Sequence, residues 1–155
     1  LHADSIGRID PLTHEIKMYD TPFKGPRRLR VDADGGIWIA AFPESQIVRF
    51  DQEKEAFEFF DLPVKPLGSE TPYSLNIDKK RSIVWVNGNT SDSLYAYYYE
   101  KKQWQHYPMA KKVTFTRDVE IAPDGTVFTT NSSFPSWHIE DAQPTLIVLD
   151  PVHIQ

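Results

Sequence analysis

The stretch Arg28-Leu-Arg-Val-Asp-Ala-Asp-Gly-Gly-Ile-Trp-Ile39 has the pattern of a short strand, a tight turn and a second strand. Asp34-Gly35 suits the turn, because Asp bonds its own backbone and Gly accepts a positive φ. The same hairpin pattern recurs in Ser74-Leu-Asn-Ile-Asp78 followed by Ser82-Ile-Val-Trp-Val86, and in Asp118-Val-Glu-Ile-Ala-Pro-Asp-Gly-Thr-Val-Phe-Thr129. One type of hairpin therefore repeats along the chain.

Two further strand patterns accompany each hairpin. An apolar strand recurs, with starting points 41, 47 and 52 residues apart, at residues 5–10, 46–51, 93–98 and 145–150. An alternating strand with a proline close behind recurs at residues 15–19, 56–60 and 103–107. Four short antiparallel strands every 40 to 50 residues are typical of the blades of a β-propeller.

The sequence thus predicts an all-β fold, a β-propeller of about three and a half blades of four antiparallel strands. With strands lettered a to d from the channel outward, we expect strands c and d at 5–20, whole blades at 27–63 and 72–109, and strands a to c at 116–150. Propellers close at four to eight blades. The ring is therefore expected to be completed by missing N-terminal blades or by a second copy of the chain.

The composition excludes several classes of protein. With 40% hydrophobic and 25% charged residues the chain is typical of a soluble globular protein, and its net charge of −5 argues against nucleic-acid binding. No apolar run approaches the roughly 20 residues of a membrane span, and no signal peptide opens the chain. The sequence has no cysteine, which excludes disulfides but leaves the compartment undetermined, with export still open.

Several motifs resemble those of the streptogramin lyases, the family of virginiamycin B lyase. The resemblance begins at Ile6-Gly-Arg-Ile-Asp-Pro11 with Glu15-Ile16 and Pro22, continues from Pro26 to Trp38, and extends more loosely over Arg117 to Thr129. It implies a propeller that opens a lactone ring by elimination. In that reaction a base removes a proton while Mg²⁺ stabilises the developing negative charge.

The chain departs from this family at the positions that carry the chemistry. The family's histidine corresponds to Arg27, Tyr73 and Arg117, and its glutamate corresponds to Ala41, Gly88 and Asn131. Arginine stays charged at neutral pH and tyrosine is a poor base. The visible blades therefore lack the lyase residues, which missing blades would have to supply, and enzymatic activity is left undecided.

The register instead predicts a ligand site at the mouth of the channel. Arg27, Tyr73 and Arg117 should occupy equivalent positions at the starts of the inner strands. Guanidinium groups bind carboxylates and phosphates through paired hydrogen bonds, so a small polar or anionic ligand is expected there. The alternative is that these arginines pair with Asp32 or Asp118 and hold neighbouring blades together.

Three asparagines at the ends of b strands are further candidates: Asn87, Asn89 and Asn131. Their amides could contact the ligand or, with Asp92 nearby, a hard cation such as calcium. The alternative is that they only bond turns. The tyrosines of 95–99 are expected to fill the space between blades.

The connection Ser132–Pro144 is unusually long for this repeat. Long loops in compact domains often carry function. Trp137 could form an aromatic wall, while His138 and Glu140 are the candidates for a catalytic base and a carboxylate or metal ligand. The alternative is a contact with another blade or subunit.

Three hypotheses for function follow. The first is a streptogramin-lyase-like propeller that binds a small molecule at its channel. The second is a non-catalytic sensor or a scaffold for protein interactions. The third is a metal-dependent lyase or lactone hydrolase whose site residues lie in missing blades.

Overall fold

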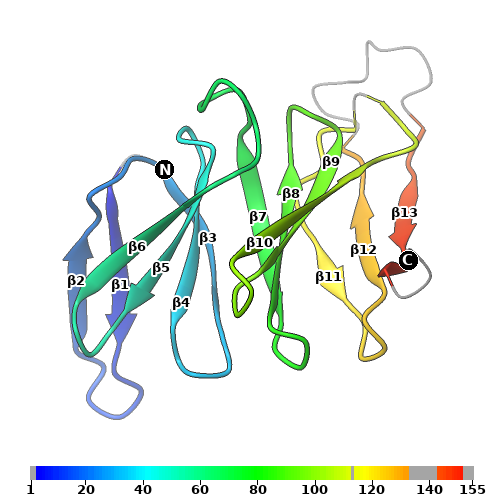
Figure 1. Cartoon of the computed structure of the whole chain (residues 1–155). Helices are drawn as coiled ribbons and strands as arrows, with labels where there is room; N and C mark the ends of the chain where they lie inside the picture. The colour runs from blue at the N-terminus through cyan, green and yellow to red at the C-terminus, as the bar shows by residue number, and fades with distance from the viewer. Residues whose placement is uncertain (1–2, 113, 133–142, 152–155) are drawn as a thin grey trace.

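The computed structural model describes residues 3–112, 114–132 and 143–151. Within this part the regular structure is almost entirely β, arranged in separate antiparallel sheets (Figure 1). The predicted all-β propeller fold is confirmed, and none of the described sheets closes on itself. No helix in the described residues is long and apolar enough to span a membrane.

Four sheets follow one another along residues 3–151, apart from the gaps at 113 and 133–142. The first contains β1 (Ser5–Ile9) and β2 (Ile16–Asp20). The second contains β3 (Pro26–Val31), β4 (Ile37–Ala41), β5 (Gln46–Asp51) and β6 (Ala56–Asp61). The third contains β7 (Pro72–Asp78), β8 (Ile83–Gly88), β9 (Ser93–Tyr98) and β10 (Gln103–Pro108). The fourth contains β11 (Glu120–Ile121), β12 (Val127–Thr130) and β13 (Leu146–Leu149).

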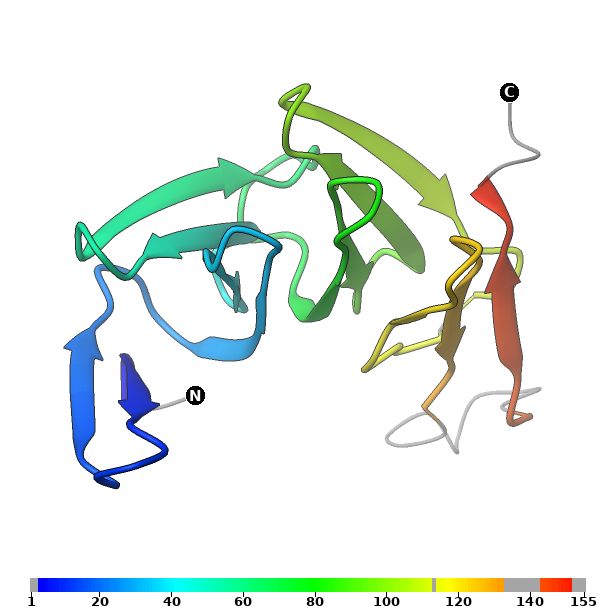
Figure 2. The ribbon, with the colours of Figure 1, turned by 90° about the horizontal axis from the view of Figure 1, so that it is seen from below.

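The sheets stand around an arc, as Figure 2 shows from below. The strands β3, β7 and β11 lie toward the concave side of the arc, whereas β6 and β10 lie on its outer side. The inner strands contact each other directly, β3 with β7 and β7 with β11. Residues near the starts of these strands can therefore meet although they are far apart in sequence.

The Asp-Gly turns form as the sequence predicts. Gly35 and Gly125 both have positive φ, at 85° and 101°. Asp32 organises the first turn, since its carboxylate accepts hydrogen bonds from the backbone N–H groups of Asp34 and Gly36. The same carboxylate accepts the indole N–H of Trp38 at 3.0 Å, which joins the turn to the core.

Three hydrophobic clusters fill the spaces between consecutive sheets. The cluster between the second and third sheets includes Trp38, Ile47, Leu75, Val86 and Tyr97. The other two clusters lie between the first and second sheets and between the third and fourth. Burying one large apolar side chain contributes about 1.5 to 3 kcal/mol, so this face-to-face packing is the main stabilising interaction.

An irregularity interrupts the inner strand of both complete sheets at the same place. In the second sheet Pro26 pairs with Ala41 and Leu29 with Ile39, which leaves an extra residue in β3. In the third sheet Pro72 pairs with Gly88 and Leu75 with Val86, so β7 has the matching irregularity. Such bulges redirect side chains and are common beside functional sites.

Candidate functional site

The starts of β3 and β7 and the segment before β11 bring three predicted residues together. The guanidinium carbon of Arg27 lies 3.4 Å from the centre of the Tyr73 ring. The guanidinium carbon of Arg117, which precedes β11, lies 5.4 Å from the same ring centre. Two sheets and the segment that leads into a third thus contribute one side chain each to a single cluster, as the register predicts.

A second aromatic ring extends this cluster. Phe42 packs edge-on against Tyr73, with ring centres 5.9 Å apart, and its ring lies 4.7 Å from the Arg27 guanidinium carbon. Arg27, Tyr73 and Arg117 are all half-buried. Aromatic faces attract a guanidinium group without neutralising its charge. The cluster, hereafter the mouth cluster (Arg27, Phe42, Tyr73 and Arg117), therefore holds positive charge at a partly desolvated position.

The carboxylates expected as alternative partners bind other arginines. Asp32 accepts a hydrogen bond from Arg49 Nε at 2.9 Å. Asp118 Oδ2 lies 3.8 Å from Arg28 Nη2. Among the described residues no carboxylate lies within ion-pair distance of Arg27, whose guanidinium instead contacts the two aromatic rings.

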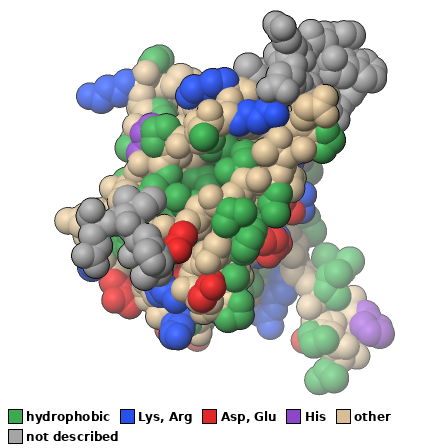
Figure 3. All heavy atoms as spheres, turned by 90° about the vertical axis from the view of Figure 1, so that its right-hand side faces the viewer, with side chains coloured by type: hydrophobic (Ala, Val, Ile, Leu, Met, Phe, Trp, Pro, Cys, Tyr) green, Lys and Arg blue, Asp and Glu red, His purple; other side chains and the backbone are tan. Residues whose placement is uncertain are grey.

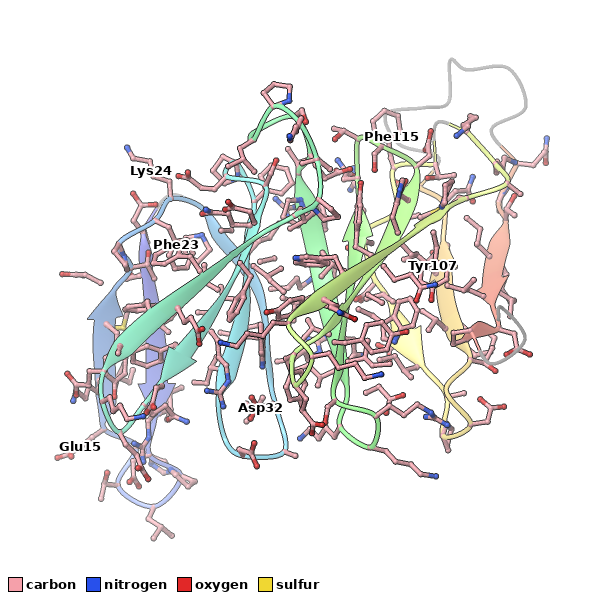
Figure 4. All side chains as sticks on the ribbon, in the orientation of Figure 1. Glu15, Phe23, Lys24, Asp32, Tyr107 and Phe115 are labelled. Carbon is pink, nitrogen blue, oxygen red and sulfur yellow. The ribbon has the colours of Figure 1, made fainter. Side chains whose placement is uncertain are left out.

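Figure 4 locates this end of the molecule. Phe23 and Lys24 lie just before β3, and Phe115 lies before β11, all at the upper end of the view. Asp32, at the far end of β3, lies at the lower end. Lys24 is exposed, which adds a further cation to the end that carries the mouth cluster.

A polar network lies directly beside the mouth cluster. The Ser74 hydroxyl donates to Asp118 Oδ1 at 2.9 Å, across the boundary between the third and fourth sheets. Arg28 reaches the other oxygen of Asp118 from the second sheet. Both charged side chains of this pair are about half exposed, at 42% and 46%. The Asp118 carboxylate beside the mouth cluster is therefore already shared by Arg28 and Ser74.

The predicted asparagines do not join the mouth cluster. Asn87 is fully buried; its amide nitrogen donates to Thr116, and its oxygen accepts the backbone N–H of Ser74 at 2.6 Å. Asn131 bonds the backbone of Gln143 and Thr145, where β13 approaches. Asn87 is therefore a link between sheets, and its predicted contact with a ligand stays a prediction.

Asn89 and Asp92 also make contacts within the chain. The Asn89 amide lies 3.4 Å from Thr71 Oγ1, while Asp92 accepts from both the N–H and the hydroxyl of Thr114. In the described part of the chain no three His, Cys, Asp or Glu side chains are grouped to hold a metal ion.

The Mg²⁺ ion that the family resemblance implies does not suit the mouth cluster. Hard divalent cations prefer carboxylate and carbonyl oxygens. The corresponding positions here carry two guanidinium groups and a phenol, and the positive charges would repel a cation. Trp137, His138 and Glu140, the remaining candidates, lie outside the described residues.

One buried polar centre had no counterpart in the predictions. Glu70 is 1% exposed. Its carboxylate accepts hydrogen bonds from the backbone of Thr71, Thr90 and Ser91 and from the Thr90 hydroxyl. Its own backbone bonds the Ser45 hydroxyl. A lone acidic residue in a segment between two sheets gives no sequence signal for this role, because its partners come from three separate loops.

Comparison with known proteins supports the fold. No protein-family model matches the sequence, and no curated protein matches it. A streptogramin B lyase structure is similar over 95% of this chain, with a TM-score of 0.77 and 17% identity. A catalytically inactive virginiamycin B lyase from Staphylococcus aureus with quinupristin is similar over 93% of this chain, with a TM-score of 0.71 and 18% identity.

A third similar structure is the extracellular domain of a protein assigned as a one-component system of B. thetaiotaomicron. It matches 81% of this chain with a TM-score of 0.61 and 17% identity. The chain covers 44% and 48% of the two lyase chains and 16% of this domain. The resemblance to the streptogramin lyases is thus confirmed for the fold, over less than half of their length.

Proposed function

We propose that this chain forms part of a propeller that binds a small anionic organic molecule at its channel mouth. The observation that carries the proposal is the mouth cluster, in which Arg27 and Arg117 from different sheets meet at the Tyr73 ring. The ligand is a carboxylate or phosphate, because a guanidinium group presents paired N–H donors that match the oxygens of either group.

The position of the cations strengthens this interpretation. Both guanidinium groups are half-buried, so an anion that reaches them is partly shielded from water. Charge-assisted hydrogen bonds contribute about 1.5 to 3 kcal/mol each. The rings of Tyr73 and Phe42 offer an apolar surface next to the charge, which favours an organic anion over an inorganic one.

Isothermal titration calorimetry with benzoate and with inorganic phosphate tests the proposal. We expect Arg27→Gln and Arg117→Gln each to weaken benzoate binding by about tenfold or more, since 1.4 kcal/mol corresponds to tenfold. Arg30→Gln is the matched control, because Arg30 lies on the same strand and its guanidinium donates a hydrogen bond to the adjacent Leu29 carbonyl instead of contacting Tyr73. Equal affinity in all three variants, or no binding of either anion, would reject the site.

The same titration with quinupristin separates binding from the family's reaction. The S. aureus lyase structure contains this compound. Ring opening by elimination leaves the mass of quinupristin unchanged, so the compound is followed by chromatographic retention and proton NMR. Quinupristin recovered with its lactone ring closed would indicate recognition alone, whereas a linear product with a new carboxylate and a new carbon–carbon double bond would indicate catalysis by the protein. Since none of the visible positions carries the family's histidine or glutamate, we expect no turnover by this chain.

A sensor role is the second candidate. The observation that favours it is the similarity to the extracellular domain from B. thetaiotaomicron. A sensor binds its ligand reversibly and releases it unchanged. Recovery of intact benzoate or quinupristin after dialysis, together with saturable binding, would support this candidate over a lyase.

A further inference from the structure

The outward face of the fourth sheet is an apolar surface that nothing in the described chain covers. Phe128 pairs with Val148 and Thr130 pairs with Leu146, which puts these four residues on one face of the sheet. Leu146 and Val148 are 62% and 54% exposed. Figure 3 shows hydrophobic side chains gathered in the middle of this side of the molecule.

The preceding sheets show what this face normally contacts. Ile47 and Leu94 occupy the same strand position as Leu146, and both are almost completely buried, at 0% and 2%. Each packs against the next sheet in its cluster: Ile47 against residues of β7 and β8, and Leu94 against Val119 and Val127. The exposed face of the fourth sheet is therefore one half of the interface that is repeated within the chain.

The other half of such an interface is exposed at the opposite end of the arc. Gly7 pairs with Met18 and Ile9 with Ile16, so these residues share the face of the first sheet that points away from the second. Ile9, Ile16 and Met18 are 57% to 64% exposed. Phe50 occupies the position in β5 that Ile9 occupies in β1. It is 1% exposed, because the first sheet covers it.

We propose that a second copy of this chain covers the face of Phe128, Thr130, Leu146 and Val148 (the C-face) with its own face of Gly7, Ile9, Ile16 and Met18 (the N-face). The contact is head-to-tail, since it joins two different surfaces. The argument rests on continuity with the repeated interface. It also agrees with the chain's covering a little under half of each lyase chain, so that two copies have about the length of one.

Light scattering on the whole chain after size exclusion tests this proposal. We expect the mass of two chains for the natural sequence. The C-face variant Leu146→Lys with Val148→Lys and the N-face variant Ile16→Lys with Met18→Lys should each have the mass of one chain. Leu67→Lys is the control, because Leu67 is 51% exposed on a loop away from both faces, and it should leave the dimer intact.

Mixing the two face variants gives the decisive result. In the mixture the C-face variant supplies a natural N-face and the N-face variant supplies a natural C-face. A head-to-tail contact therefore predicts that the mass of two chains returns. Circular dichroism shows that each variant remains folded. A monomeric natural chain would overturn the proposal. A dimer that survives the N-face substitutions would overturn the head-to-tail contact.

Discussion

The guanidinium carbon of Arg27 lies 3.4 Å from the centre of the Tyr73 ring, and the two residues start the inner strands of neighbouring sheets. Both residues fall where their strand carries an extra residue relative to its partner. The same local irregularity in two sheets thus directs one cation and one aromatic ring toward a common point.

Tyr73 serves as the platform for both cations. We expect Tyr73→Leu to weaken benzoate binding by a few-fold to about tenfold, because a cation–π contact contributes about 0.5 to 2 kcal/mol to holding each guanidinium. Tyr73→Phe keeps the ring and should change the affinity little. Calorimetric titration of the two variants checks this, and equal losses in both would assign the effect to the hydroxyl.

Asp32 should make stability depend on acid pH. Burial acts to raise the pKa of Asp32, but hydrogen bonds from Arg49, Trp38 and Gly36 outweigh it and hold the pKa below its ordinary value. A carboxyl group with a lowered pKa stabilises the fold above its unfolded pKa of about 3.9, and this contribution is lost as the pH falls through the folded pKa.

Asp32→Asn tests that dependence. Removing one partner of a buried ion pair costs about 3 kcal/mol or more, so urea unfolding at pH 7 should show a clear loss of stability. The difference between variant and natural protein should begin to shrink below about pH 4, where the carboxyl group of the unfolded natural chain becomes protonated, and should go on shrinking as the pH falls through the lowered pKa of the folded state. A difference that stays constant from pH 7 to pH 3 would contradict the ionic role of Asp32.

Asn87 is predicted to be important for stability. Asn87→Ala leaves the N–H of Ser74 and the carbonyl of Thr116 without their buried partner, which should cost about 1 to 3 kcal/mol in the free energy of unfolding. Asn89→Ala is the control, because the contact of the Asn89 amide nitrogen with Thr71 Oγ1, at 3.4 Å, is long for a hydrogen bond. Comparable losses in both variants, measured by urea unfolding, would argue against the linking role.

Gly88 is closely surrounded. A Cβ atom at this position would lie 2.6 Å from Glu70 Oε2 and 2.8 Å from Tyr95 Cε2. Gly88→Ala should therefore cost about 1 to 3 kcal/mol through overpacking. Gly7→Ala, where the nearest atom is the flexible Met18 sulfur at 3.0 Å, should cost less. Thermal unfolding of both variants compares their losses of stability. A larger loss for Gly7→Ala than for Gly88→Ala would contradict the packing described around Glu70.

The repeats were sufficient to predict the sheets and the convergence at the mouth. Strand period, Asp-Gly turns and prolines are local signals, and a fixed register carries Arg27, Tyr73 and Arg117 to equivalent places. From its position at the end of a strand, Asn87 could be predicted either to contact a ligand or to bond a turn, and its contact with Thr116 of the neighbouring segment could not be predicted. The structure places it inside, since β8 is buried on both sides by neighbouring sheets.

Contacts between loops could not be predicted in this way. Glu70 is held by Ser45, Thr90 and Ser91, which come from two other loops, and Asn87 bonds Thr116 of the next sheet. No periodicity connects these positions. These contacts form only once whole sheets are placed next to each other, which brings the Glu70 carboxylate to its donors and the Asn87 amide to the backbone of the neighbouring segment.

Nuclear magnetic resonance of the arginine side chains tests the anion site most directly. The protein, labelled with ¹⁵N, is titrated with benzoate while the Nε–H signals are followed. We predict saturable shifts for Arg27 and Arg117, with Arg30 and the paired Arg49 and Arg81 unchanged. If these five of the chain's seven arginines shift alike, or if Arg27 and Arg117 do not respond, the mouth cluster is not the ligand site.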